Sequence, residues 1–284
     1  MTPDRADRPA RARRRPPVAL ALPAAVGALL LLTPLVAMVV LAPWRDLPAL
    51  LARPAVLDAL RLSLVTASVS TLLCLAMGVP LAWVLARADA HPGGPTGPAR
   101  AAAVRLLRAV VTLPMVLPPV VGGVALLLAY GRTGLVGRWL YEATGWQVPF
   151  TATAVVLAQT FVALPFLVVT VEGALRSTGT ALEEAAATLG AGPLTTFRRV
   201  TLPALGPSIA AGAVLGWARA LGEFGATVTF AGNLPGVTQT MPSAVYRAFE
   251  TDPPAAVALS LVLLAVCVTV LVLLRDRWTP GLPR

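Results

Sequence analysis

The sequence contains no lysine, and charged residues of all kinds make up only 13% of its 284 positions. Soluble domains are roughly a quarter charged, so this composition argues against a soluble protein with a large core. The missing lysine also excludes a Walker A phosphate loop, in which a lysine reaches the β- and γ-phosphates of a nucleotide. If a nucleotide drives this protein, we therefore expect another chain to bind it.

Cysteine and histidine, which often hold metal ions or act in catalysis, are also scarce. The two cysteines, Cys74 and Cys267, both lie inside apolar runs, where they are typical of small buried hydrophobic residues. The single histidine, His91, lies in a stretch rich in Gly and Pro that is typical of a solvated loop. We therefore predict no metal site, no catalytic residue and no cofactor bound by this chain, and we do not expect an enzyme.

Long apolar runs are what the sequence does contain. Hydrophobic residues fill 57% of the chain, and several continuous runs reach the roughly 20 residues that a helix needs to cross a bilayer. We therefore predict an all-α polytopic membrane protein. Its six predicted transmembrane helices cover residues 18–42, 57–86, 104–130, 150–171, 203–230 and 254–274.

Two of the predicted spans contain residues that break helices. The second contains Gly78 and Pro80, and the third contains Pro114, Pro118 and Pro119. Inside a membrane such breaks persist where neighbouring helices or a cavity satisfy the freed backbone groups. They fit either the wall of a transport pathway or a kinked helix that is simply packed.

A single transmembrane domain is expected over residues 18–275. Residues 1–17 are rich in Arg and Pro and are expected to be a disordered cytoplasmic N-terminus, and residues 276–284 a cytoplasmic tail. The first apolar run far exceeds the roughly 7–15 residues of a signal-peptide core, which favours an uncleaved first span. Residues 176–202, called the insert below, form a small, polar, helix-forming segment between the fourth and fifth spans.

The distribution of arginine predicts the orientation in the membrane. With the N-terminus inside, sixteen of the 23 arginines fall in cytoplasmic segments or at the cytoplasmic ends of spans, six fall outside or at the outer ends of spans, and Arg219 lies deeper within a span. Cytoplasmic loops carry the excess of basic residues in membrane proteins. We therefore expect both termini and the insert on the cytoplasmic side. Topology accounts for the positive charge, so no nucleic-acid partner is needed.

The insert carries signals for two short helices. Thr180 and Glu183 have the spacing of a capping box, which predicts a helix over residues 181–189. Gly190 can end that helix in the left-handed conformation, and Pro193 can begin a second one. Without further information, the segment could be either an element that couples to a soluble partner or an interfacial helix that stiffens a loop.

The motif Glu-Ala-Ala, three residues, Gly, nine residues, then Val-x-Leu-Pro resembles the EAA motif of ABC-importer permease subunits. The resemblance is carried by Glu184, Ala185, Ala186, Gly190, Val200, Leu202 and Pro203, with Val200 in place of the more usual isoleucine. It implies that residues 181–190 dock into a groove of a separate ATP-binding subunit, which binds the ATP and Mg. The residues assigned to this coupling are Glu183, Glu184, Ala185, Ala186, Leu189, Gly190 and Ala191.

A second resemblance narrows the family. The stretch from Ala220 to Thr227, together with residues 233–236 and Thr238-Gln239-Thr240-Met241-Pro242, is similar to molybdate permeases. Sulfate and thiosulfate permeases share part of it, so sulfate, thiosulfate and tungstate remain alternative cargoes, and a non-transporting scaffold or sensor remains an alternative role. The resemblance implies a homodimer of permeases in the bacterial inner or plasma membrane, two ATP-binding subunits and a periplasmic or lipid-anchored oxyanion-binding protein.

Polar residues in and after the fifth span are candidates for the translocation path. Arg219 and Glu223 are four residues apart and therefore share a helix face, where ionisable groups at such depth usually face a bundle interior or a cavity. The two residues could line the translocation path or could form an ion pair that stabilises helix packing. Hydroxyl and amide groups beyond them could hold a tetrahedral dianion loosely, as a conduit requires. These further candidates are Thr227, Thr229, Thr238, Gln239 and Thr240.

Overall fold

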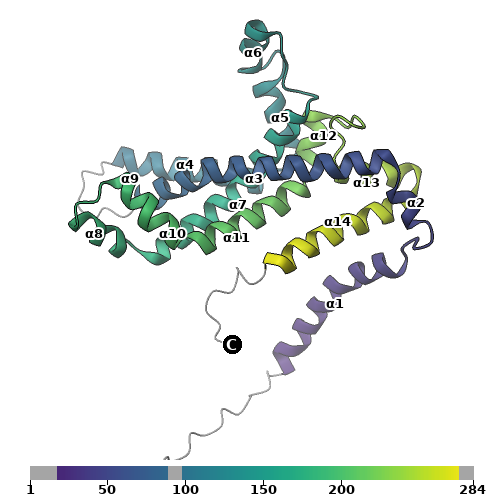
Figure 1. Cartoon of the computed structure of the whole chain (residues 1–284), viewed down its shortest axis with the longest axis horizontal. Helices are drawn as coiled ribbons and strands as arrows, with labels where there is room; N and C mark the ends of the chain where they lie inside the picture. Colours follow the sequence, from purple (N-terminus) through teal and green to yellow (C-terminus); the bar gives the residue numbers. More distant parts are fainter. Residues whose placement is uncertain (1–17, 89–97, 275–284) are drawn as a thin grey trace, which may run out of the picture. The chain divides into compact units, whose positions relative to one another are not determined.

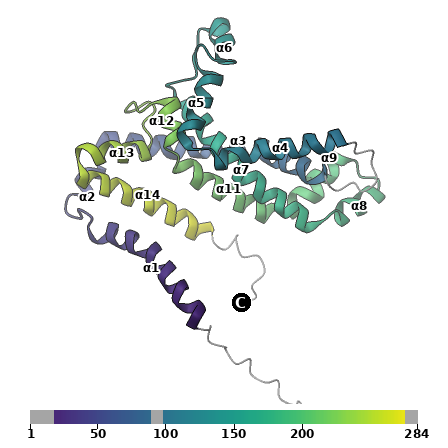
Figure 2. The same cartoon turned by 180° about the vertical axis from the view of Figure 1, so that it is seen from behind.

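The computed structural model describes residues 18–88 and 98–274 (Figures 1 and 2). The predictions of a disordered N-terminus (1–17) and a cytoplasmic tail (276–284) lie outside these residues. The chain divides into two compact units, residues 1–42 and 43–284. The described part of the first unit is a long apolar helix, α1 (Val18–Val40). The remaining helices belong to the second unit.

Across the described residues the secondary structure is entirely helical, as the sequence predicts. The second unit contains α2 (Leu47–Leu51), α3 (Pro54–Ala88), α4 (Pro98–Val116), α5 (Pro119–Tyr130), α6 (Gly137–Thr144), α7 (Ala152–Thr178), α8 (Ala181–Thr188), α9 (Pro193–Thr196), the π-helical turn η1 (Phe197–Thr201), α10 (Leu202–Ala204), α11 (Gly206–Leu221), α12 (Gly225–Ala231), α13 (Met241–Thr251) and α14 (Pro253–Leu274).

Several of these helices are long and apolar enough to cross a membrane. Within the described ranges, four helices meet that requirement alone: Ala19–Val40, Pro54–Ala88, Ala152–Thr178 and Pro253–Leu273. A fifth candidate is the bent pair Pro193–Ala204 and Gly206–Leu221, whose axes differ by 72°. The chain is therefore a multi-pass membrane protein by length and composition.

The predicted third span, residues 104–130, is divided between two helices. α4 ends at Val116 and α5 begins at Pro119. Pro118 is extended, with φ −54° and ψ 132°, because the ring of Pro119 disfavours helical geometry in the preceding residue. The break therefore occurs at the prolines noted in the sequence.

The predicted fifth span, residues 203–230, is also divided. α11 ends at Leu221 and α12 begins at Gly225, with Gly222, Glu223 and Phe224 between them. The predicted face-sharing pair therefore joins Arg219, in the last turn of α11, to Glu223, which lies in the break itself.

A stripe of small residues allows α3 to pack closely against α7 and α11. The buried face of α3 carries a small side chain at nearly every turn: Ala59, Ser63, Ala67, Ser70, Cys74, Gly78, Ala82 and Ala86. Small residues let membrane helices approach closely, which strengthens van der Waals packing. This matters in lipid, because the hydrophobic effect does not drive helices together there. A Cβ on Gly78 would lie 2.8 Å from Leu167 of α7, and one on Gly212 of α11 would lie 3.0 Å from the same leucine. Leu167 therefore fills the space between three helices.

α5 packs against α12 at two glycines, in the part of the second unit where α5 and α6 rise from the bundle (Figures 1 and 2). A Cβ on Gly123 would lie 2.6 Å from Cβ of Thr229, and one on Gly225 would lie 2.6 Å from Cβ of Pro119. Real Cβ contacts of that length essentially do not occur. Glycine at both positions is therefore required for α12 to lie against α5.

Candidate functional site

The insert folds as the two short helices that its sequence predicts, followed by a π-helical turn. Its first three residues, 176–178, are the end of α7, which extends seven residues past the predicted fourth span. α8 covers Ala181–Thr188, and α9 begins with Pro193. The predicted helix end at Gly190 is confirmed, since its φ is +81°.

The end of α8 is a Schellman motif. Gly190 N–H donates to the carbonyl of Ala187 at 3.0 Å, and Ala191 N–H donates to the carbonyl of Ala186 at 3.0 Å. These two bonds satisfy carbonyl groups that a helix end leaves unpaired. The positive φ that they require favours glycine, so the glycine of the motif has a local structural cause.

The predicted capping box at the start of α8 is wrong. Thr180 makes no side-chain hydrogen bond to the backbone at the helix start, and its hydroxyl donates to the carboxylate of Glu184 instead. The carboxylate of Glu183 is occupied by two other donors, from Arg87 and Thr201. A charge-assisted bond to arginine is stronger than one to a neutral backbone N–H, which explains why the box does not form.

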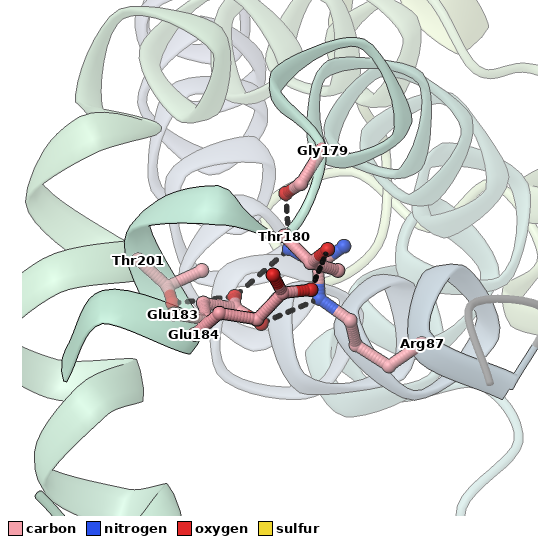
Figure 3. Close-up of polar contacts among 6 residues, drawn as sticks. All are labelled: Arg87, Gly179, Thr180, Glu183, Glu184 and Thr201. Atoms are coloured by element: carbon pink, nitrogen blue, oxygen red, sulfur yellow. Dashed lines mark hydrogen bonds and ion pairs between the residues drawn. The ribbon is translucent and has the colours of Figure 1, made fainter. Parts of the chain in front are cut away.

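The two adjacent glutamates of α8 have different environments (Figure 3). Glu183 points toward α3, where Nη2 of Arg87 donates to its Oε1 at 2.8 Å and Nε of Arg87 lies 2.8 Å from its Oε2. Thr201 of η1 donates to the same Oε1 at 2.7 Å. Glu184 is exposed. The sequence placed both residues at the partner interface, whereas the structure gives Glu183 internal partners.

The remaining coupling residues lie on the outer surface of the insert. Ala185, Leu189 and Gly190 are exposed, and Ala186 and Ala191 are half-buried. Leu189 has 88% of its surface exposed, and Leu194 of α9 has 67%. Both leucines therefore leave apolar surface on the insert that nothing in the described residues covers.

Burial alone raises the pKa of Glu183, but hydrogen bonds from Arg87 and Thr201 and the charge of Arg87 outweigh it, so the pKa lies below its ordinary value of 4.5. A lowered carboxyl pKa stabilises the fold at pH values above 4.5, and this contribution is lost as the pH falls through the lowered value. We expect Glu183→Gln to reduce the free energy of unfolding by about 1–3 kcal/mol at about pH 7, because it leaves largely buried donors of Arg87 without the carboxylate that they bond. The difference should shrink below pH 4.5, as measured by thermal unfolding in detergent at several pH values.

The matched control for this prediction is Glu142→Gln. Glu142 forms an ion pair with Arg138 on α6, but both side chains are more than half exposed. Exposed pairs contribute about 0–1 kcal/mol. Equal effects of the two substitutions at neutral pH would contradict the assignment.

A second set of ion pairs lies near the same end of the bundle and was missed by sequence reasoning. Glu172 of α7 is buried, and its Oε1 lies 2.9 Å from Nη2 of Arg108 on α4 and 3.0 Å from Nη2 of Arg176. Arg108 also donates to the carbonyl of Leu85 on α3 at 3.4 Å. The available signal was an acidic residue immediately after the apolar run 150–171, with an arginine four positions later.

The pathway candidates fall into two groups with separate partners. Arg219 and Glu223 form the predicted pair, with Nη1 2.6 Å from Oε2, and Glu223 is 1% exposed against 30% for Arg219. The other carboxylate oxygen of Glu223 accepts from Ala226 N–H at 2.8 Å, at the start of α12. The pair therefore fixes the break between α11 and α12.

The second group holds the turn that leads into α13. Thr238 accepts a hydrogen bond from Leu234 N–H at 3.0 Å, and the hydroxyls of Thr240 and Ser243 lie 3.2 Å apart. Ser63 of α3 accepts from the backbone N–H of Met241 at 2.7 Å. Thr238 and Thr240, two of the predicted pathway residues, therefore stabilise this turn. Thr229 bonds to its own helix, whereas the Thr227 hydroxyl and the Gln239 amide nitrogen are buried and have no hydrogen-bond partner among the described residues.

Comparison with known proteins identifies the family of the chain. Residues 97–282 match the family described as binding-protein-dependent transport system inner membrane component. The chain belongs to this family, and its role is therefore in transport across a membrane.

Individual relatives agree with the narrower resemblance. The chain is 52% identical to the molybdenum transport system permease protein ModB of Mycobacterium tuberculosis, over 88% of this chain and 90% of the relative. It is 39% identical to ModB of Escherichia coli, over 80% of this chain and 94% of the relative. A bacterial alginate ABC transporter shares the fold, with a TM-score of 0.68 at 17% identity over 93% of this chain and 96% of that one.

Proposed function

We propose that this chain is the transmembrane permease subunit of an ATP-driven importer that moves an oxyanion, molybdate, into the cell. The similarity to ModB proteins along nearly nine-tenths of the chain supports the cargo. The exposed surface of α8 and the turn after it supports the coupling to an ATPase, since the lysine-free chain has no phosphate loop of its own.

In the proposed mechanism, two copies of the chain form the pathway and two ATP-binding subunits contact the insert. ATP and Mg are bound by those subunits. When ATP draws the subunits together, each insert moves with its partner and the helices reorient a central cavity between the two sides of the membrane. A periplasmic or lipid-anchored binding protein delivers the anion from outside.

The arrangement has six spans with both termini in the cytoplasm. α4 and α5 together make the third span and α11 and α12 the fifth, and at the second break the carboxylate of Glu223 accepts from the freed N–H of Ala226. The excess of arginine in the segments assigned to the cytoplasm supports this orientation. It places the insert on the side where ATP is available.

The candidates for the path are Arg219, Glu223, Thr227, Thr229, Thr238, Gln239 and Thr240. Within the first pair, Arg219 neutralises a carboxylate that would otherwise repel an anion, and its side chain keeps 30% of its surface exposed. Neutral donors such as the Thr227 hydroxyl and the Gln239 amide can hold a dianion weakly enough to release it.

The test is uptake of labelled molybdate by vesicles that contain the permease, its ATPase and the binding protein. We expect ATP-dependent accumulation that unlabelled tungstate and sulfate reduce less than unlabelled molybdate does. Stronger competition by sulfate or tungstate would reassign the cargo. ATPase binding without accumulation of any oxyanion would favour a scaffold or sensor.

A further inference from the structure

The insert is attached to a helix far away in the sequence as well as to its chain neighbours. Arg87, at the end of α3, reaches α8 through Glu183 and also donates to the carbonyl of Gly179 at 3.2 Å. Thr201, in η1, reaches the same carboxylate. We call Arg87, Glu183 and Thr201 the latch (Figure 3).

The latch is sheltered and strongly bonded. The side chains of Arg87 and Glu183 are 12% and 19% exposed, and the guanidinium meets both carboxylate oxygens. A pair in this environment is screened by solvent much less than a surface pair. Separating it would leave two largely buried charges without partners, which is costly.

The chain connection from the insert to α11 is irregular. After α9, the insert leads into α11 through a π-helical turn of five residues, a helical piece of three residues and a bend of 72°. Single π-helical turns are uncommon and frequently occur at functional sites. Besides the chain connections to α7 and α11, a displacement of α8 therefore has a direct route to α3 through Arg87.

The C-terminal end of α3, where Arg87 lies, is bonded to neighbouring helices. The last turns of α3 are tied to α4 through Leu85 and Arg108, and Arg108 pairs with Glu172 of α7. α3 then packs against α7 through its stripe of small residues. A force applied at Arg87 therefore reaches α3, α4 and α7 together.

We propose that the latch transmits the movement of α8 to α3, so that Glu183 and Arg87 are positioning residues for transport and not part of the docking surface for the ATPase. This proposal rests on the proposed function, because it assumes that an ATPase moves the insert. It assigns the adjacent glutamates separate tasks, with Glu183 facing α3 and Glu184 facing the partner.

The first test measures molybdate accumulated and ATP hydrolysed in the same vesicles. The variants are Glu183→Gln, Arg87→Gln and Thr201→Val, and Arg105→Gln is the matched control because it removes an exposed arginine from α4. We expect the first two to bind the ATPase and hydrolyse ATP but to accumulate at least about fivefold less molybdate per ATP, within the usual range of coupling between sites. Thr201→Val should show a smaller loss, and Arg105→Gln should match the unaltered protein.

Two results would overturn the proposal. One is an unchanged ratio of molybdate to ATP in the latch variants. The other is loss of ATPase binding by Glu183→Gln but not by Arg87→Gln, which would place the carboxylate in the docking surface. A failure of the proposed function would look different, since the unaltered complex would then accumulate no oxyanion.

A second measurement does not depend on the cargo. Spin labels at Val84→Cys and Ala187→Cys, both exposed positions, report the distance between α3 and α8 in the assembled complex. We expect one narrow distribution with and without ATP, and a broad one after Glu183→Gln. If Glu183→Gln does not assemble, Thr201→Val removes one hydrogen bond and is expected to broaden the distribution less. An unbroadened distribution in either variant would overturn the latch.

Discussion

Arg219→Ala is expected to reduce the free energy of unfolding by about 3–5 kcal/mol and to abolish most uptake, because it leaves the carboxylate of Glu223 buried without its cation. Glu223 is 1% exposed, so water cannot replace the lost partner. Among the described residues, the carboxylate would keep one donor, the N–H of Ala226. The measurements are thermal or denaturant unfolding in detergent and molybdate uptake by vesicles.

The control for Arg219→Ala is Glu223→Gln. The amide oxygen can still accept from Ala226, and Arg219 keeps 30% of its surface in contact with solvent or a neighbouring chain. We expect a cost of about 1–2 kcal/mol, and the double variant should be more stable than Arg219→Ala alone because no charge is left unpaired. Normal stability of Arg219→Ala combined with lost uptake would instead favour a direct role in the path.

Gly190→Val is expected to leave the protein in the membrane but to reduce ATP-driven uptake about tenfold. Apart from Gly190 itself and its two chain neighbours, no atom of the described residues lies within 4 Å of the position that a Cβ would occupy, so the effect does not come from a clash. It comes from the φ of +81°, which costs a residue with a side chain about 1–2 kcal/mol and a β-branched one more. Valine should therefore open the Schellman motif and unwind the last turn of α8.

Gly190→Asn is the matched control, because asparagine adopts the left-handed conformation far more readily than valine. We expect near-normal uptake from it. The comparison is made by uptake and by ATP hydrolysis at equal amounts of assembled complex. Coupled transport by Gly190→Val would count against the assignment of α8 as the coupling element.

Local signals along the sequence predicted the helical elements well. The apolar runs located the long helices, and Gly190 and Pro193 marked the helix boundaries of the insert, because φ preferences and missing N–H groups act over a few residues. Pro118 and Pro119 were recognised as helix breakers, but periodicity could not show that they divide a span into two helices.

Local signals in the sequence could not predict contacts between residues that are far apart along the chain. The pairing of Arg87 with Glu183 joins residues 96 positions apart, and Glu172 meets Arg108 across 64 positions. The capping box failed for the same reason, since a stronger donor from α3 occupies the glutamate that the box required. The Arg219–Glu223 pair was predictable because its partners are separated by a single helical turn.

The placement of Glu183 and Glu184 makes α8 sensitive to insertions and deletions. Successive residues of a helix are rotated by about 100° around its axis, so one carboxylate faces α3 while the next faces solvent. Removing one residue between Gly179 and Glu183 would turn Glu184 toward Arg87 and move Glu183 to the position that Leu182 now occupies. Changes in length, more than changes in side chain, are therefore the variation that this short helix should tolerate least.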